Sequence, residues 1–195
     1  MLIPHSLQEP LMNIIPLLTT AVIAPHGMTD LIHAENNDKV LQLFRINIVA
    51  VAASMLLHMI NLDEMTTTAF LTSSAIHFRH DFPVKNEFLK LFASSALVMN
   101  AENIGIELFI CYMCFIHVPN HYKIYKPMIM NNLKKSIFYI SLCAIISTYA
   151  MYSNVELIYD KNVFTISEAL IISHIFYEEF YTKNNTIVNK MNILG

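Results

Sequence analysis

Long apolar runs separated by short polar breaks are the feature that most constrains how this chain can fold. A helix needs about 20 apolar residues to cross the hydrocarbon core of a bilayer, and most of the runs approach that length. Only 14% of the residues are charged, whereas a soluble globular domain carries about 25%. The pattern predicts an all-α fold, a polytopic transmembrane helix bundle of about seven helices. The runs cover 11–32, 40–61, 65–82, 87–100, 103–121, 136–153 and 162–181.

Length, charge and cysteine usage narrow the class of protein further. A chain of 195 residues is long enough for one membrane domain, which we expect to cover 1–195. The small net charge of −3 indicates no nucleic-acid partner. The three cysteines, at 111, 114 and 143, lie in apolar runs and are expected to be core residues. The N-terminus lacks the basic region and cleavage site of a signal peptide, so we expect the first run to be retained.

The distribution of positive charge orients the bundle. The region 87–121 can be interpreted as one span, giving six helices, or as two spans that are broken at "NAENIG", 100–105. With seven helices, Lys161 is the one basic residue on its side of the membrane, and the other eleven lie on the opposite side. Cytoplasmic loops collect Lys and Arg. The sequence therefore predicts a multi-pass membrane protein with seven helices, its N-terminus outside and its C-terminus in the cytoplasm.

Histidines gather toward the cytoplasmic ends of the odd-numbered predicted helices. A neutral imidazole is a good ligand for iron, copper or zinc, and an ionisable residue inside a span is by default a functional-site hypothesis. Positions i and i+4 share one helix face, although the proline inside "HVPNH" would break or kink a helix. The alternative is that these histidines solvate the headgroup region. The predicted metal ligands are His26, His77, His117 and His121, with His174 as an additional candidate.

An acidic residue follows the first of these histidines. Asp30 lies four positions after His26, so it could accept the ring N–H of that ligand, as carboxylates near metal sites often do. The alternative interpretation, an aspartate at a helix end that faces water, has equal support.

Four stretches of the chain, in order, resemble motifs of the Brp/Blh family of membrane β-carotene 15,15′-dioxygenases. "PHGMTD" resembles the family's P-H-G-x-x-D motif, and "SSAIHF" resembles a run of small residues that ends in H-F. "CFIHVPNHY" is similar to C-F-I-H-x-x-x-H followed by an aromatic residue. "SEALIISHIFYEEF" is similar to a final segment in which an acidic residue, here Glu179, follows a histidine by five positions.

The resemblance implies a function. It implies Fe²⁺ held by the four predicted ligands, with His174 and Glu179 as further candidates, and cleavage of the central double bond of β-carotene by O₂. The retinal formed would supply a rhodopsin. Two departures from the family are that this chain has only 39 residues between His77 and His117, and that Arg79 follows the H-F pair. Aromatic residues expected to line the path of the carotenoid from the bilayer are Phe44, Phe70, Phe78, Phe109, Tyr112 and Phe115.

Other classes of membrane protein remain open on the sequence. One is a di-iron desaturase or hydroxylase, which would hold two irons and usually has histidine pairs that are absent here. Another is a protein that binds carotenoid or haem without catalysis. A retinal opsin is disfavoured, because a lysine is needed in the last helix and Lys161 and Lys183 flank the apolar run instead.

Overall fold

The computed structural model describes residues 15, 17–101, 106–153 and 161–182. Within these residues all regular structure is helical, in seven helical stretches without a strand, some of which contain π or 3-10 turns. The predicted all-α fold is confirmed for this part of the chain. The chain divides into two compact units, unit 1 (Met1–Ile32 and Asn100–Ile158) and unit 2 (His33–Met99 and Tyr159–Gly195). The expected single domain over 1–195 stays a prediction.

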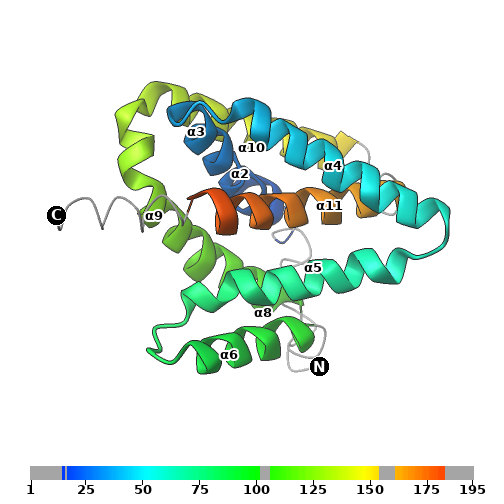
Figure 1. Ribbon diagram of the computed structural model, residues 1–195. Helices are drawn as coiled ribbons and strands as arrows, with labels where there is room; N and C mark the ends of the chain where they lie inside the picture. Colours follow the sequence, from blue (N-terminus) through cyan, green and yellow to red (C-terminus); the bar gives the residue numbers. More distant parts are fainter. Residues whose placement is uncertain (1–14, 16, 102–105, 154–160, 183–195) are drawn as a thin grey trace, which may run out of the picture. The chain divides into compact units, whose positions relative to one another are not determined.

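Unit 1 pairs an N-terminal helical stretch with a long helix from the second half of the chain. The π-helix η1 (Thr19–Ile23) and the short α2 (Ala24–His26) pack against α10 (Leu133–Ser153) (Figure 1). Ser147 donates a hydrogen bond to the carbonyl of Thr20 at 2.7 Å. The hydroxyl of Ser147 thus supplies a hydrogen-bond donor to a carbonyl of the π-helix η1. Side chains that insert such bonds are one cause of irregular helix geometry. The rest of the unit comprises α8 (Ile106–Tyr112), η3 (Met113–His117), α9 (Val118–Asn131) and the start of α3 (Met28–Asn36).

Two prolines in unit 1 each follow a π-helical turn. Pro25 and Pro119 are the second residues of α2 and α9, and these helices begin directly after η1 and η3. A proline in a regular helix lacks a donor and clashes with the carbonyl four residues back, and the wider π turn relieves this conflict. The sequence interpretation ended a helix at 121, and that boundary is wrong. The helix continues to Asn131, because the proline falls where a helical segment tolerates it.

Unit 2 is a group of packed helices held by polar contacts between them. The helix α11 (Lys161–Tyr177) packs against both α4 (Val40–Met59) and α5 (Asp63–Phe78), and α5 packs against α6 (Glu87–Met99) (Figure 1). Ser173 donates to the side-chain oxygen of Asn47 at 2.5 Å, and Ser94 donates to the carbonyl of Ala75 at 2.6 Å. Such interhelical hydrogen bonds by small polar side chains are typical of helices packed in membranes. The 3-10 turn η2 (Arg79–Asp81) follows α5, and the π-helix η5 (Glu178–Thr182) follows α11.

Local signals explain where the helices of unit 2 end. Asn61 has a φ of 57° after α4, in the left-handed conformation that commonly terminates helices. The side chain of Asn86 accepts hydrogen bonds from the N–H groups of Phe88 and Leu89, and so caps the start of α6. This helix ends at Met99 and α8 begins at Ile106. Residues 102–105, which form most of the predicted break in 87–121, lie outside the described residues.

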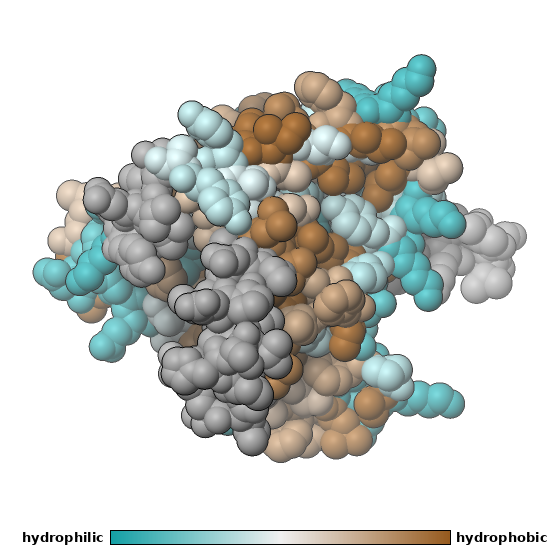
Figure 2. All heavy atoms as spheres, turned by 180° about the vertical axis from the view of Figure 1, so that it is seen from behind, coloured by the Kyte–Doolittle hydropathy of each residue, from teal (hydrophilic) through white to brown (hydrophobic). Residues whose placement is uncertain are grey.

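Among the described helices, α4 and α10 are long and apolar enough to cross a membrane, with mean hydropathies of 1.9 and 1.4. Only 11% and 6% of their most apolar windows are buried, unlike the core helix of a soluble protein. Many side chains on the surface are hydrophobic, as the brown atoms of Figure 2 show. The seven membrane crossings and the outside N-terminus stay predictions.

Candidate metal centres

Three histidines of unit 1 form a buried cluster, which we call the unit 1 cluster. One ligand nitrogen of each of His26, His117 and His121 lies within 4.8 Å of those of the other two. The ring centroids are separated by 5.4, 5.0 and 4.8 Å. All three side chains are buried. Three imidazoles at such distances can bind a single metal ion.

Backbone irregularities position the unit 1 cluster. The ring nitrogen Nδ1 of His26 is hydrogen-bonded to the carbonyl of Ile23. A carbonyl only accepts, so Nδ1 carries the proton and Nε2 presents its lone pair, which is the usual arrangement for a metal-ligating histidine. His117 is the last residue of the π-helix η3, and His121 lies in the first turn of α9. π turns inside helices occur frequently at functional sites.

Two tyrosines cover the unit 1 cluster. The ring of Tyr112 stacks on that of His117 with centroids 6.5 Å apart, and the ring of Tyr125 stacks on that of His121 at 5.7 Å. Tyr125 is almost fully buried. Because the three imidazoles are buried, a bound ion would lie away from bulk water, where electrostatic interactions are stronger.

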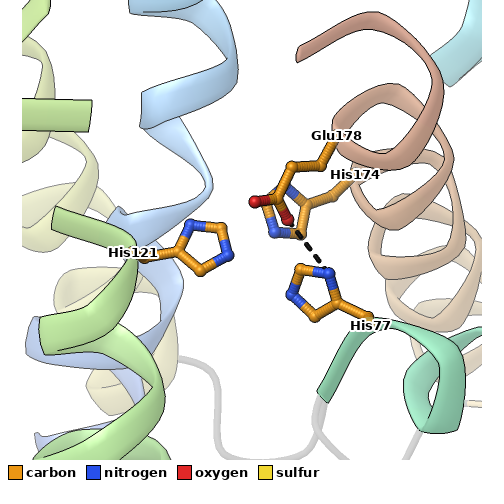
Figure 3. Close-up of side chains that lie close together, drawn as sticks. All are labelled: His77, His121, His174 and Glu178. Atoms are coloured by element: carbon orange, nitrogen blue, oxygen red, sulfur yellow. Dashed lines mark ion pairs between the residues drawn. The ribbon is translucent and has the colours of Figure 1, made fainter. Parts of the chain in front are cut away.

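A second cluster of metal-ligating side chains lies in unit 2, and we call it the unit 2 cluster. Ligand atoms of His77, His174 and Glu178 lie within 4.8 Å of one another. His77 is in the last turn of α5, His174 is near the end of α11, and Glu178 is the first residue of η5. The Nδ1 atom of His77 is 3.0 Å from a carboxylate oxygen of Glu178 (Figure 3, where His121 of unit 1 is also labelled). Glu178 is only 2% exposed.

Charged residues surround the unit 2 cluster. Arg79 donates a hydrogen bond to the carboxylate of Glu179 at 3.1 Å, and the Nε2 atom of His80 lies 3.3 Å from the same carboxylate. Nδ1 of His77 is 4.0 Å from Glu179. The sequence places the charge of Arg79 two positions after the predicted ligand His77. The carboxylate of Glu179 in η5 balances this charge.

Three of the four predicted ligands come together in unit 1. His77 belongs to unit 2. That it shares one metal site with the other three histidines stays a prediction. The additional candidate His174 lies next to His77, with ring centroids 5.6 Å apart. Asp30 is buried in the first turn of α3, and its role as a hydrogen-bond acceptor for a ligand stays a prediction.

The sequence interpretation missed Glu178 and chose its neighbour Glu179. The resemblance pointed to an acidic residue five positions after His174. Helical spacing favours the residue four positions after it, because i and i+4 share one face. The structure follows that spacing, and Glu178 is the carboxylate that lies with the two histidines.

The predicted carotenoid-lining aromatic residues do not share one environment. Tyr112 contacts His117, and Phe109 packs beside Tyr112 with ring centroids 6.1 Å apart. Phe44 and Phe115 are exposed, and Phe78 is buried. Phe70 is partly buried. Lining of a carotenoid path by these residues stays a prediction.

The fold and the clusters define a class, a helical protein with buried histidine clusters that could hold a metal ion. The donors are imidazoles, joined in unit 2 by one carboxylate, and both sets fit iron or another divalent transition metal. Comparisons with protein-family models, with curated proteins and with solved structures found no match.

Proposed function

We propose that this chain is an integral membrane, iron-dependent oxygenase that cleaves the central double bond of β-carotene with O₂ to give two molecules of retinal. One oxygen atom goes to each new aldehyde, so the reaction needs no further reductant. The unit 1 cluster carries the proposal. Its three histidines come from "PHGMTD" and "CFIHVPNHY", two of the stretches that resemble the dioxygenase family, and they lie together and are buried.

The residues of unit 1 have three tasks in this proposal. His26, His117 and His121 hold the ion, and the hydrogen bond to the carbonyl of Ile23 fixes the orientation of His26. Tyr112 and Tyr125 exclude water from the imidazoles. Iron supplies the activation of O₂ when it is bound, as cofactors do for chemistry beyond side chains. His77, which the resemblance implies as a fourth ligand, belongs to unit 2 and is not assigned to this ion.

The exposed apolar helices support a membrane location and a lipid-soluble substrate. The helices α4 and α10 expose large hydrophobic side chains, and each helix is long enough to cross the hydrocarbon core of a bilayer. β-Carotene is a long apolar molecule that dissolves in the bilayer, and in our proposal it reaches the protein from there. Phe109 and Tyr112, which pack next to His117, are the first candidates to contact it.

Expression in bacteria that accumulate β-carotene tests the proposal. We expect the full chain to bleach the cells and to produce retinal, measured by chromatography of the pigment extract. The His117→Ala variant should produce no retinal. The matched control is His58→Ala, which removes a partly exposed histidine whose ring pairs with Asp63 at 2.6 Å, and this variant should retain activity.

Two results would contradict the proposal. Retinal formation by His117→Ala at the wild-type rate would exclude the unit 1 cluster as the site. Bleaching without retinal would show cleavage at another bond.

A second candidate function is a membrane hydroxylase or desaturase that uses two metal ions. The unit 2 cluster favours it, because it offers a second ligand set that includes a carboxylate. The products separate the two candidates, since a hydroxylase or desaturase would yield a modified lipid or carotenoid of unchanged carbon number and no retinal.

A further inference from the structure

We propose that unit 2 holds a divalent metal ion of its own through His77, His174 and Glu178. The inference goes beyond the proposed function, which assigns an ion to the unit 1 cluster. Two histidines and one carboxylate are the donors of the facial triad of non-haem Fe(II) oxygenases. Such a set leaves coordination positions open for a small molecule. We expect Fe²⁺ as the natural ion, with Mn²⁺, Co²⁺ and Zn²⁺ as substitutes.

The separations of the donor atoms suit a shared ion. Ligand atoms at about 2.1 Å from a metal are about 3.0 Å apart when they are adjacent in an octahedron and about 3.4 Å apart in a tetrahedron. Nδ1 of His77 and the nearest oxygen of Glu178 are 3.0 Å apart. All three ligand atoms lie within 4.8 Å of one another, so small side-chain adjustments bring them onto one ion.

Electrostatics also favours a cation at this place. Glu178 is 2% exposed and His77 is 4% exposed, and a buried carboxylate is costly unless a positive charge compensates it. The guanidinium of Arg79 donates to Glu179, whereas the carboxylate of Glu178 lies 3.0 Å from the ring of His77. A divalent ion would compensate the carboxylate of Glu178 and would also use a ring nitrogen of His174.

The rival explanation is an ion pair between a protonated His77 and Glu178 without metal. In that case His174 would be a packing residue, and its loss would not change metal content. The two explanations therefore differ in the role of His174, which makes this residue the most informative one to replace.

The experiment counts metal ions on the purified full chain in detergent. The protein is stripped with a chelator, loaded with Co²⁺ without oxygen, desalted, and measured by elemental analysis. We expect two ions per chain for the wild type and one for each of His174→Ala, Glu178→Gln and His117→Ala. The combined variant with both His174→Ala and His117→Ala should bind none.

Two further variants separate ligand loss from misfolding. Glu168→Gln alters a buried glutamate of α11, to which Thr67 donates a hydrogen bond, and this control should retain two ions. Glu178→His replaces one ligand by another and should also retain two. Each variant is checked for helical content by circular dichroism.

The outcomes separate this inference from the proposed function. The inference would be overturned if the folded wild type bound no ion, or if both His174→Ala and Glu178→Gln kept the metal content of the wild type. Retinal formation is scored independently. Two ions without carotenoid cleavage would contradict the proposed function alone. Cleavage by a chain whose metal content does not change in His174→Ala and Glu178→Gln would contradict the inference alone.

Discussion

The two ligand clusters use the same kind of side chain but different means of positioning it. In unit 1 the ligands are three histidines, and both helical stretches that carry them contain a π turn followed by a proline. In unit 2 the ligands are two histidines and a glutamate, and an arginine, another histidine and a second glutamate surround them. Glu178 also begins a π-helix, η5, but no proline follows it there. The comparison indicates that π turns with prolines organise the unit 1 cluster, whereas charged neighbours distinguish the unit 2 cluster.

This difference determines which substitutions should disturb each cluster. A change in helix register should affect the unit 1 cluster and leave unit 2 intact. A change in charge should affect unit 2, where the carboxylates of Glu178 and Glu179 lie side by side in sequence. Removal of a ligand should abolish metal binding in either unit, so it does not distinguish the two clusters. Substitutions away from the ligands test the comparison more sharply.

The largest effect is expected from Pro119→Ala. Without the proline ring, the π turn of η3 can relax to a regular α-helix, and one residue fewer in that turn rotates the preceding segment by about 100°. His117 would then no longer face His121. We expect retinal formation in carotenoid-accumulating cells to fall by about 10- to 100-fold, the usual range when the support of a metal ligand is lost.

The control for this substitution is Pro127→Ala. Pro127 lies inside the same helix, is exposed, and is six positions from His121. Its replacement should leave retinal formation unchanged. Equal losses of activity in the two proline variants would contradict the idea that the π turn sets the register of the unit 1 cluster.

The sequence predicts the helical class and the i, i+4 pair of histidines, because apolar runs and local spacing determine both. It ends the predicted helix at 121, where the apolar run gives way to polar residues, although the helix continues to Asn131. It also misses Glu178, which helical spacing from His174 would have selected. The division of the ligands between two units could not be predicted, because it depends on contacts between segments far apart in the chain.

A smaller effect is expected from His33, the buried histidine of unit 2 that is hydrogen-bonded to Tyr177 at 3.0 Å and is not part of either cluster. Burial, with a smaller contribution from the charge of Lys39, lowers the pKa of His33 from 6.5 to about 4. The unfolded chain therefore binds a proton at this residue below pH 6.5, whereas the folded chain does not until about pH 4. The contribution of His33 to stability is present above pH 6.5 and is lost as the pH falls through this window.

Replacing His33 by Gln should make the midpoint of thermal unfolding less dependent on pH between 6.5 and 4. The measurement compares wild type and variant after removal of metal, in the same detergent, so that other histidines contribute equally to both curves. Parallel curves for the two proteins would show that His33 is not the residue that titrates. Lys39→Gln serves as a second probe and should raise the pKa of His33.

The smallest effect is expected from the pair Arg79 and Glu179, because its side chains are 26% and 13% exposed. Ion pairs with such access to solvent contribute about 0.2–1 kcal/mol. A double-mutant cycle with Arg79→Ala and Glu179→Gln should give a coupling of that size in the free energy of unfolding, and it should shrink as salt is added. The metal content of unit 1 should stay constant throughout the cycle. A change there would show that charge in unit 2 influences the unit 1 cluster, and the contrast between a geometric cluster and an electrostatic one would fail.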